Sequence, residues 1–193
     1  MDSVLPLQTR PDAHRLPNAV LGVSILIAAE VMFFAAFISA HTIARATALG
    51  GVWPPAGQPR LPDERTALNT AALLLSGLLL WTGNRPMVKS SEVARRCIVG
   101  AILLGAAFVA LQGVEWIALL REGLTMTSSA HGGFFYLIIG AHFLHVVGGL
   151  VALTWAFVGT LRKTLAPETF TATRLFWYFV VLLWPVLYWR VYL

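Results

Sequence analysis

Ionisable side chains within long apolar stretches are the residues of this sequence that could do chemistry. Glu30 stands in the stretch Ala-Ala-Glu-Val-Met-Phe-Phe, and Glu115 stands one helical turn after Gln112. His142 and His145 are one helical turn apart, so they share a helix face. Such side chains are costly inside a membrane unless they are paired or hydrated, and they often mark proton paths. We therefore treat both glutamates and both histidines as candidates for proton handling or for contact with lipid or water in a cleft.

The depth of these residues along their helices predicts which of them meet. At a rise of about 1.5 Å per residue, Glu30 and the two histidines lie near the middle of their spans, whereas Glu115 lies closer to the outer surface. We expect a hydrogen bond between Glu30 and one of the histidines. For Glu30, a functional and a structural role are equally open. For the histidines, a hydrogen bond to a neighbouring helix is favoured over a proton relay and over metal or haem ligation, and Glu115 also favours a structural role.

Several known kinds of site lack the residues that they need. A di-iron site in a helix bundle requires Glu-x-x-His motifs, and no glutamate precedes a histidine by that spacing. His131 and His145 have a spacing that suits two haems, but no second helix offers a matching pair. No aspartate lies in an apolar stretch, which excludes a Ser-His-Asp triad, and Cys97 is the single cysteine, which excludes a multi-cysteine metal site. We therefore predict no catalytic residue and no metal ligand.

The composition places these residues in a membrane protein. Hydrophobic residues make up 58% of the chain and charged residues 12%, with a mean hydropathy of +0.73. Soluble domains are about half apolar and a quarter charged, so a soluble enzyme and a disordered chain are both excluded. The net charge of +5 does not indicate a nucleic-acid partner, because the basic residues lie between apolar stretches, where they set membrane topology.

Five apolar stretches are long enough to cross a bilayer, which takes about 20 residues each. They cover about residues 19–44, 66–83, 97–120, 131–161 and 175–193. Period-two alternation is absent, which disfavours a membrane β-barrel. The sequence thus predicts an all-α, polytopic membrane protein: residues 1–18 form a tail, and residues 19–193 form a single domain of five transmembrane helices in a bundle.

Charge distribution and small residues predict how the spans are arranged. Lysine and arginine are more frequent in the tail and in the loops after the second and fourth spans, which predicts a cytoplasmic N-terminus and an external C-terminus. Gly148 and Gly149 continue the histidine face and favour close helix packing, as does Gln112 on the third span. The tryptophans cluster near span ends and are interpreted as membrane-interface residues: Trp53, Trp81, Trp116, Trp155, Trp177, Trp184 and Trp189.

The order of the motifs resembles that of a known family. Four stretches carry the likeness: Glu30–Phe34; Gly50–Pro55 with Leu61-Pro62, Leu68–Thr70 and Ser76-Gly77; Leu111–Trp116; and His142–Gly149. In this order they resemble subunit III of the haem–copper oxidases, the family of cytochrome c and quinol oxidases. They cover nearly the whole chain.

The resemblance implies a fold, partners and a localisation. The five spans resemble the shorter bacterial form of the family, whose helices form two groups around a V-shaped cleft that holds phospholipids. The family member binds neither haem nor copper, and it packs against subunit I, which carries both. The resemblance implies a non-catalytic accessory subunit in the bacterial inner membrane, which stabilises subunit I, supports proton uptake and gives oxygen access. Glu30 matches the family's carbodiimide-reactive glutamate, a carboxyl that is protonated in an apolar setting.

The last span departs from the family pattern. The family typically reads Trp-His-Phe-x-Asp-x-x-Trp, where this chain has Tyr178 at the His position and Val181 at the Asp position. These departures keep a second interpretation open, a subunit-III-like protein associated with a nitric oxide reductase. A stand-alone proton-coupled transporter and a membrane metalloenzyme are further alternatives. Transporters often show internal repeats and broken helices, and the sequence shows neither.

Overall fold

The computed structural model describes residues 17–48, 52–83 and 91–193. Over these ranges the chain forms five α-helices and a closing π-helical turn, with no strand: α1 Asn18–Ala46, α2 Asp63–Gly83, α3 Ser91–Arg121, α4 Ala130–Leu161, α5 Pro167–Leu187 and η2 Tyr188–Tyr192. All five α-helices are long and apolar enough to cross a membrane. The prediction of an all-α bundle of five membrane spans is confirmed. Residues 1–16 of the predicted tail lie outside the described residues.

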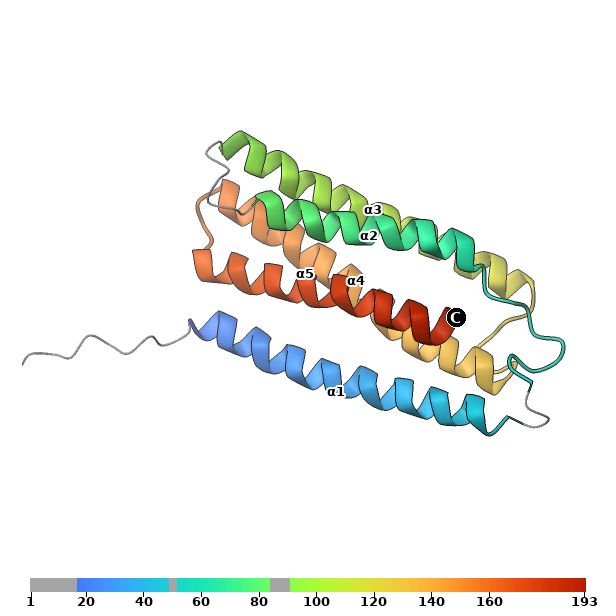
Figure 1. The fold of residues 1–193 in the computed structure, drawn as a ribbon. Helices are drawn as coiled ribbons and strands as arrows, with labels where there is room; N and C mark the ends of the chain where they lie inside the picture. The colour runs from blue at the N-terminus through green and yellow to red at the C-terminus, as the bar shows by residue number, and fades with distance from the viewer. Residues whose placement is uncertain (1–16, 49–51, 84–90) are drawn as a thin grey trace, which may run out of the picture.

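Successive helices run in opposite directions (Figure 1). α2 packs along α3, α4 packs along α5, and α1 lies along α5 and α4. The odd-numbered helices therefore all end at one end of the bundle, together with the C-terminus. There the Arg45 guanidinium at the end of α1 lies 3.4 Å from the Leu193 carbonyl oxygen. This end also holds the pocket between α2 and α3 that is described below.

Two helices begin earlier than the hydropathy predicts. α3 begins at Ser91 instead of residue 97, and its added turn holds Glu92, which pairs with Arg95 at 2.7 Å and with Arg96 at 3.1 Å. α5 begins at Pro167 instead of residue 175, with the proline in the first turn, where its missing N–H costs nothing. Hydropathy identifies only the apolar part of a helix. The helix extends farther into the polar region where it is stabilised by i,i+3 and i,i+4 ion pairs or begins with a proline.

Two of the tryptophans form the centre of the bundle. Trp177 and Trp184 on α5 are both 0% exposed, and their indole N–H groups donate to Ser76 Oγ at 3.1 Å and to Thr70 Oγ1 at 2.8 Å on α2. The interpretation of these two residues as membrane-interface residues was therefore wrong. Their N–H groups find hydroxyl partners inside the protein, which allows full burial of an indole. Trp155, by contrast, is 58% exposed on the lipid-facing surface.

Glycines let the indole of Trp177 fit between helices. A methyl group added at Gly105 on α3 would lie 2.8 Å from the Trp177 ring, and one added at Gly149 on α4 would lie 3.1 Å from it. Gly149 thus lets α4 approach the indole of Trp177 closely. A methyl group at Gly148 would meet no atom within 4 Å, so the described part of the chain gives Gly148 no helix to pack against.

Candidate functional site

Glu30 and His145 form a pair between α1 and α4. Glu30 Oε2 lies 3.1 Å from His145 Nε2, and the two side chains are 20% and 21% exposed. The other ring nitrogen, Nδ1, lies 2.7 Å from the Ala141 carbonyl oxygen. A carbonyl oxygen only accepts, so Nδ1 carries a hydrogen and donates it. The predicted bond between Glu30 and a histidine is confirmed, with His145 as the partner.

A hydrogen bond between these two groups requires a proton on either the carboxyl group or the ring. With Nδ1 committed to Ala141, either a protonated Nε2 donates to an ionised Glu30, or a protonated Glu30 donates to a neutral Nε2. Phe34, whose ring lies 5.5 Å from that of His145, covers one side of the pair. The pair therefore lies partly among apolar side chains, with about one-fifth of each side chain exposed.

His142 does not join this pair. Its side chain is fully buried and stacks on Trp184, with ring centroids 5.0 Å apart and planes at 26°. Neither ring nitrogen has a hydrogen-bond partner among the described residues. The two histidines, which were predicted to share a helix face, thus have different neighbours. His145 faces α1, whereas His142 is more deeply buried and faces the aromatic core. Within the described ranges no group of three or more His, Cys, Asp or Glu side chains is placed to hold a metal ion.

Glu115 lies at the centre of a second polar cluster, which joins α2, α3 and η2. Thr66 Oγ1 lies 2.9 Å from both carboxylate oxygens, and the Tyr192 hydroxyl donates to Oε1 at 3.0 Å. Gln112 Nε2 donates to the Tyr192 oxygen at 3.1 Å, and Gln112 Oε1 accepts from Asn69 Nδ2 at 3.2 Å. These bonds compensate for the burial of a carboxyl group, which is costly without hydrogen-bond partners. Gln112 therefore links Asn69 on α2 to Tyr192 on η2.

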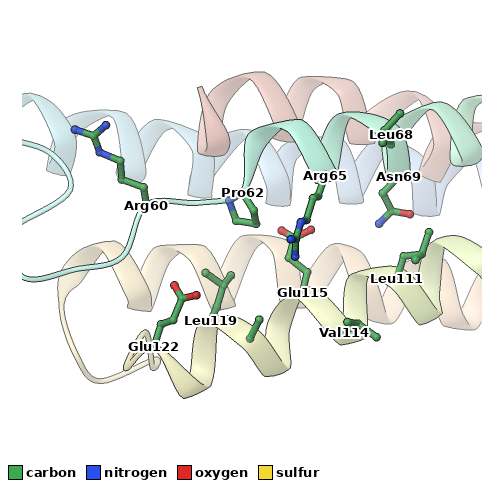
Figure 2. A pocket seen from close by; sticks show the side chains of 11 residues that line it. Arg60, Pro62, Arg65, Leu68, Asn69, Leu111, Val114, Glu115, Leu119 and Glu122 are labelled. Carbon is green, nitrogen blue, oxygen red and sulfur yellow. The ribbon is translucent and has the colours of Figure 1, made fainter.

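A cavity of about 420 Å³ opens beside this cluster, between the start of α2 and the end of α3. Figure 2 shows Arg60 and Glu122 at its loop end, Glu115 near its middle, and Leu68 and Leu111 farther along the span. The lining residues are Arg60, Pro62, Arg65, Leu68, Asn69, Leu111, Val114, Glu115, Ala118, Leu119 and Glu122. The carboxyl group of Glu115 thus lies between the charged residues at the loop end of the cavity and the apolar residues farther along it.

Sequence reasoning missed three members of this cluster. Thr66, Asn69 and Tyr192 carry no charged group that is conspicuous in a membrane span, so none of them was named as a site candidate, although Asn69 lies in the Leu68–Thr70 motif. A signal was present in α2, where Thr66, Asn69, Thr70 and Ser76 recur at helical spacing and mark a polar face. In the structure all four side chains are buried.

Gln112 offers a test of the cluster. Changing Gln112 to leucine removes one buried hydrogen bond each from Asn69 and Tyr192, which keep their bonds to the Phe108 carbonyl and to Glu115, and should lower the free energy of unfolding by about 1–3 kcal/mol. The measurement is thermal or denaturant unfolding in mild detergent. The control is Val114→Leu, on the same helix at a side chain that is 66% exposed, where no change is expected. Equal stability of Gln112→Leu and the control variant would show that the cluster contributes nothing.

The fold and its two polar sites define a polytopic helical membrane protein with carboxyl groups held between its spans. Comparison with known proteins identifies the family. The family model for cytochrome c oxidase subunit III matches residues 16–193. The chain belongs to the cytochrome c oxidase subunit III family, as the order of the motifs predicts.

Individual relatives agree with this assignment. A probable cytochrome c oxidase subunit 3 from Nocardia farcinica is 36% identical over 182 residues, which cover 91% of this chain and 88% of that protein. One from Mycobacterium leprae is 34% identical over 191 residues, covering 96% and 93% of the two chains. The cytochrome c oxidase subunit 3 of Homo sapiens is 33% identical over 179 residues, covering 89% of this chain and 67% of that protein.

The departure in the last span has a structural counterpart. A methyl group added at Gly77 on α2 would lie 2.9 Å from Val181 Cγ1, so α5 approaches α2 closely at the position where the family pattern has aspartate. An apolar side chain pressed on a glycine gives van der Waals packing without a polar partner. Tyr178, at the histidine position, is half-buried and packs against the core.

Proposed function

We propose that this chain is the non-catalytic subunit III of a bacterial terminal oxidase in aerobic respiration. It associates with the other oxidase subunits, and its principal neighbour is subunit I, which carries haem and copper. The family match over residues 16–193 supports this proposal most strongly. The chain lies in the inner membrane with its N-terminus in the cytoplasm and its C-terminus outside, because lysine and arginine favour the cytoplasmic side.

Within the complex, the chain stabilises its neighbour, holds phospholipids in a V-shaped cleft, gives oxygen access and supports proton uptake. The last role is assigned to the Glu30–His145 pair. The two side chains lie 3.1 Å apart, are about one-fifth exposed, and join two different helices. In a carboxyl–imidazole pair of this kind a proton can pass between the two partners, and the ionised form is a closed ion pair instead of a bare charge in the membrane.

The test is purification of a tagged chain in mild detergent, followed by a reduced-minus-oxidised spectrum and mass analysis of the proteins that accompany it. A haem signal together with a large polytopic partner is the expected result. Oxygen consumption by that preparation supports a terminal oxidase, whereas nitric oxide consumption would assign the chain to a nitric oxide reductase. A folded, colourless chain without a partner would contradict the proposal and favour a stand-alone proton-coupled transporter.

A further inference from the structure

A second pocket, of about 560 Å³, lies at the end of the bundle that holds the C-terminus (Figure 1). It opens between the end of α1, the loop that leads to α2, the start of α4 and η2. Arg45 and Arg60 are among the residues that line it, and no described residue of the lining is acidic. Trp53, Pro54 and Leu61 add apolar walls. The pocket thus combines positive charge with apolar surface.

Three rings fix the inner wall of this pocket. Trp53 packs edge-on against His41 of α1 and His131 of α4, with ring centroids 5.6 Å and 5.4 Å away. The two histidines are 2% and 3% exposed. Two helices therefore hold the indole in place before any ligand binds, and a wall that is already ordered lowers the cost of binding.

The pocket also offers polar groups that the described chain does not use. Gln58 Oε1 accepts hydrogen bonds from the hydroxyls of Ser128 at 3.0 Å and Ser129 at 3.1 Å. These two bonds occupy the carbonyl side of the amide and leave its N–H groups as donors. His131 Nε2 is shielded from solvent and has no hydrogen-bond partner among the described residues. A buried polar atom without a partner costs free energy, which favours a ligand that supplies one.

Arg60 carries a positive charge that no described carboxylate neutralises through an ion pair. It lines both this pocket and the cavity beside Glu115, and Figure 2 shows its guanidinium directed away from the carboxyl groups of Glu115 and Glu122. Arg45, whose guanidinium lies 3.4 Å from the Leu193 carbonyl oxygen, is a second cation in the lining. Guanidinium groups with no described acidic neighbour in the pocket favour an anionic ligand, and a carboxylate matches their planar fork of donors.

We propose that this pocket receives an acidic side chain from an outer loop of a neighbouring subunit, with Arg60 as its charged ligand. The site rests on the proposed function, which gives the chain its neighbours and places this end of the bundle outside the membrane. Gln58 and His131 supply further hydrogen bonds beside the guanidinium. The apolar walls favour a carboxylate carried by a polypeptide, because a small inorganic anion has no apolar surface to place against Trp53 and Pro54.

The test is crosslinking of the purified complex with a water-soluble carbodiimide, which joins a lysine amine to a carboxyl group only where the two are in contact. Arg60→Lys keeps the positive charge and places an amine in the pocket, in a chain whose own lysines are Lys89 and Lys163. Peptide mass analysis should find an amide between position 60 and an aspartate or glutamate of a neighbouring subunit. The wild type should not form it, because a guanidinium does not couple in this reaction.

Arg121→Lys is the matched control, because Arg121 ends α3 at the same end of the bundle but does not line the pocket. It should give no amide to that carboxyl group. A second measurement reverses the charge. Arg60→Glu should speed the loss of the neighbouring subunit from the tagged chain during washing about tenfold, because like charges would then face each other. Arg121→Glu should leave that rate at the wild-type value.

Three results would overturn the proposal. The first is an amide from position 60 to Glu64 or Glu122 of this chain alone, and the second is equal coupling from position 121. The third is a gain in thermal stability of the complex with millimolar succinate that Arg60→Gln abolishes, without any amide to a neighbour, because the occupant would then be a free carboxylate. A complex that keeps its subunits but lacks the amide contradicts this site alone, whereas a chain that purifies without any subunit contradicts the proposed function as well.

Discussion

Replacing Trp177 with alanine is expected to destabilise the bundle by about 3–5 kcal/mol, the range for removing a large aromatic side chain from a packed core. The indole is 0% exposed, lies between Gly105 and Gly149, and donates to Ser76. One side chain of α5 therefore contacts α2, α3 and α4. Its loss leaves a cavity that glycines on two helices cannot fill, and it leaves the Ser76 hydroxyl without the indole donor.

The measurement is the free energy of unfolding in mild detergent, with Trp155→Ala as the control because Trp155 is 58% exposed. The control should change stability little. Trp177→Phe should lie between the wild type and Trp177→Ala, because it keeps a ring but loses the bond to Ser76. If Trp177→Ala were as stable as Trp155→Ala, Trp177 would not be the packing centre of the helix bundle.

Changing Glu30 to glutamine should abolish carbodiimide labelling of the chain. The reagent requires a protonated carboxyl group that it can reach, and Glu30 is about one-fifth exposed and lies 3.1 Å from the ring of His145. The amide keeps a hydrogen bond to the ring, so assembly and thermal stability should stay close to those of the wild type. The readout is the extent of labelling by peptide mass analysis.

Glu115→Gln is the matched control for this experiment, because Glu115 is also an intramembrane carboxyl group. Glu115 accepts bonds from Thr66 and Tyr192, which occupy the oxygens that the reagent would need to reach. In the Glu115→Gln variant, labelling of Glu30 should therefore persist. Unchanged labelling in Glu30→Gln would show that the reactive carboxyl group is elsewhere, with Glu115 as the next candidate.

The sequence predicted the parts of this structure that depend on local pattern. The apolar stretches predicted the five spans. The similar depth of Glu30 and the histidines in their spans predicted their hydrogen bond, because a charged group in lipid has few possible partners. The order of four motifs gave the family.

The remaining features depend on how helices rotate against one another, which a single sequence does not fix. Trp177 and Trp184 were interpreted as membrane-interface residues, but glycines and hydroxyls on other helices make them core residues. Tyr192 belongs to the Glu115 cluster because η2 brings the chain end back to α3. Gly148 continues the histidine face, yet the described chain leaves that side open.

The central claim is that this chain supports oxygen chemistry in a partner without carrying it. The most direct test compares the oxidase complex purified from cells with and without the chain, measuring haem content, steady-state oxygen consumption and proton uptake. Unchanged haem content with lower oxygen consumption and proton uptake, both restored by the wild-type chain, is the predicted result. Loss of the haem signal in proportion to the missing chain would contradict it, and so would unchanged oxygen consumption and proton uptake.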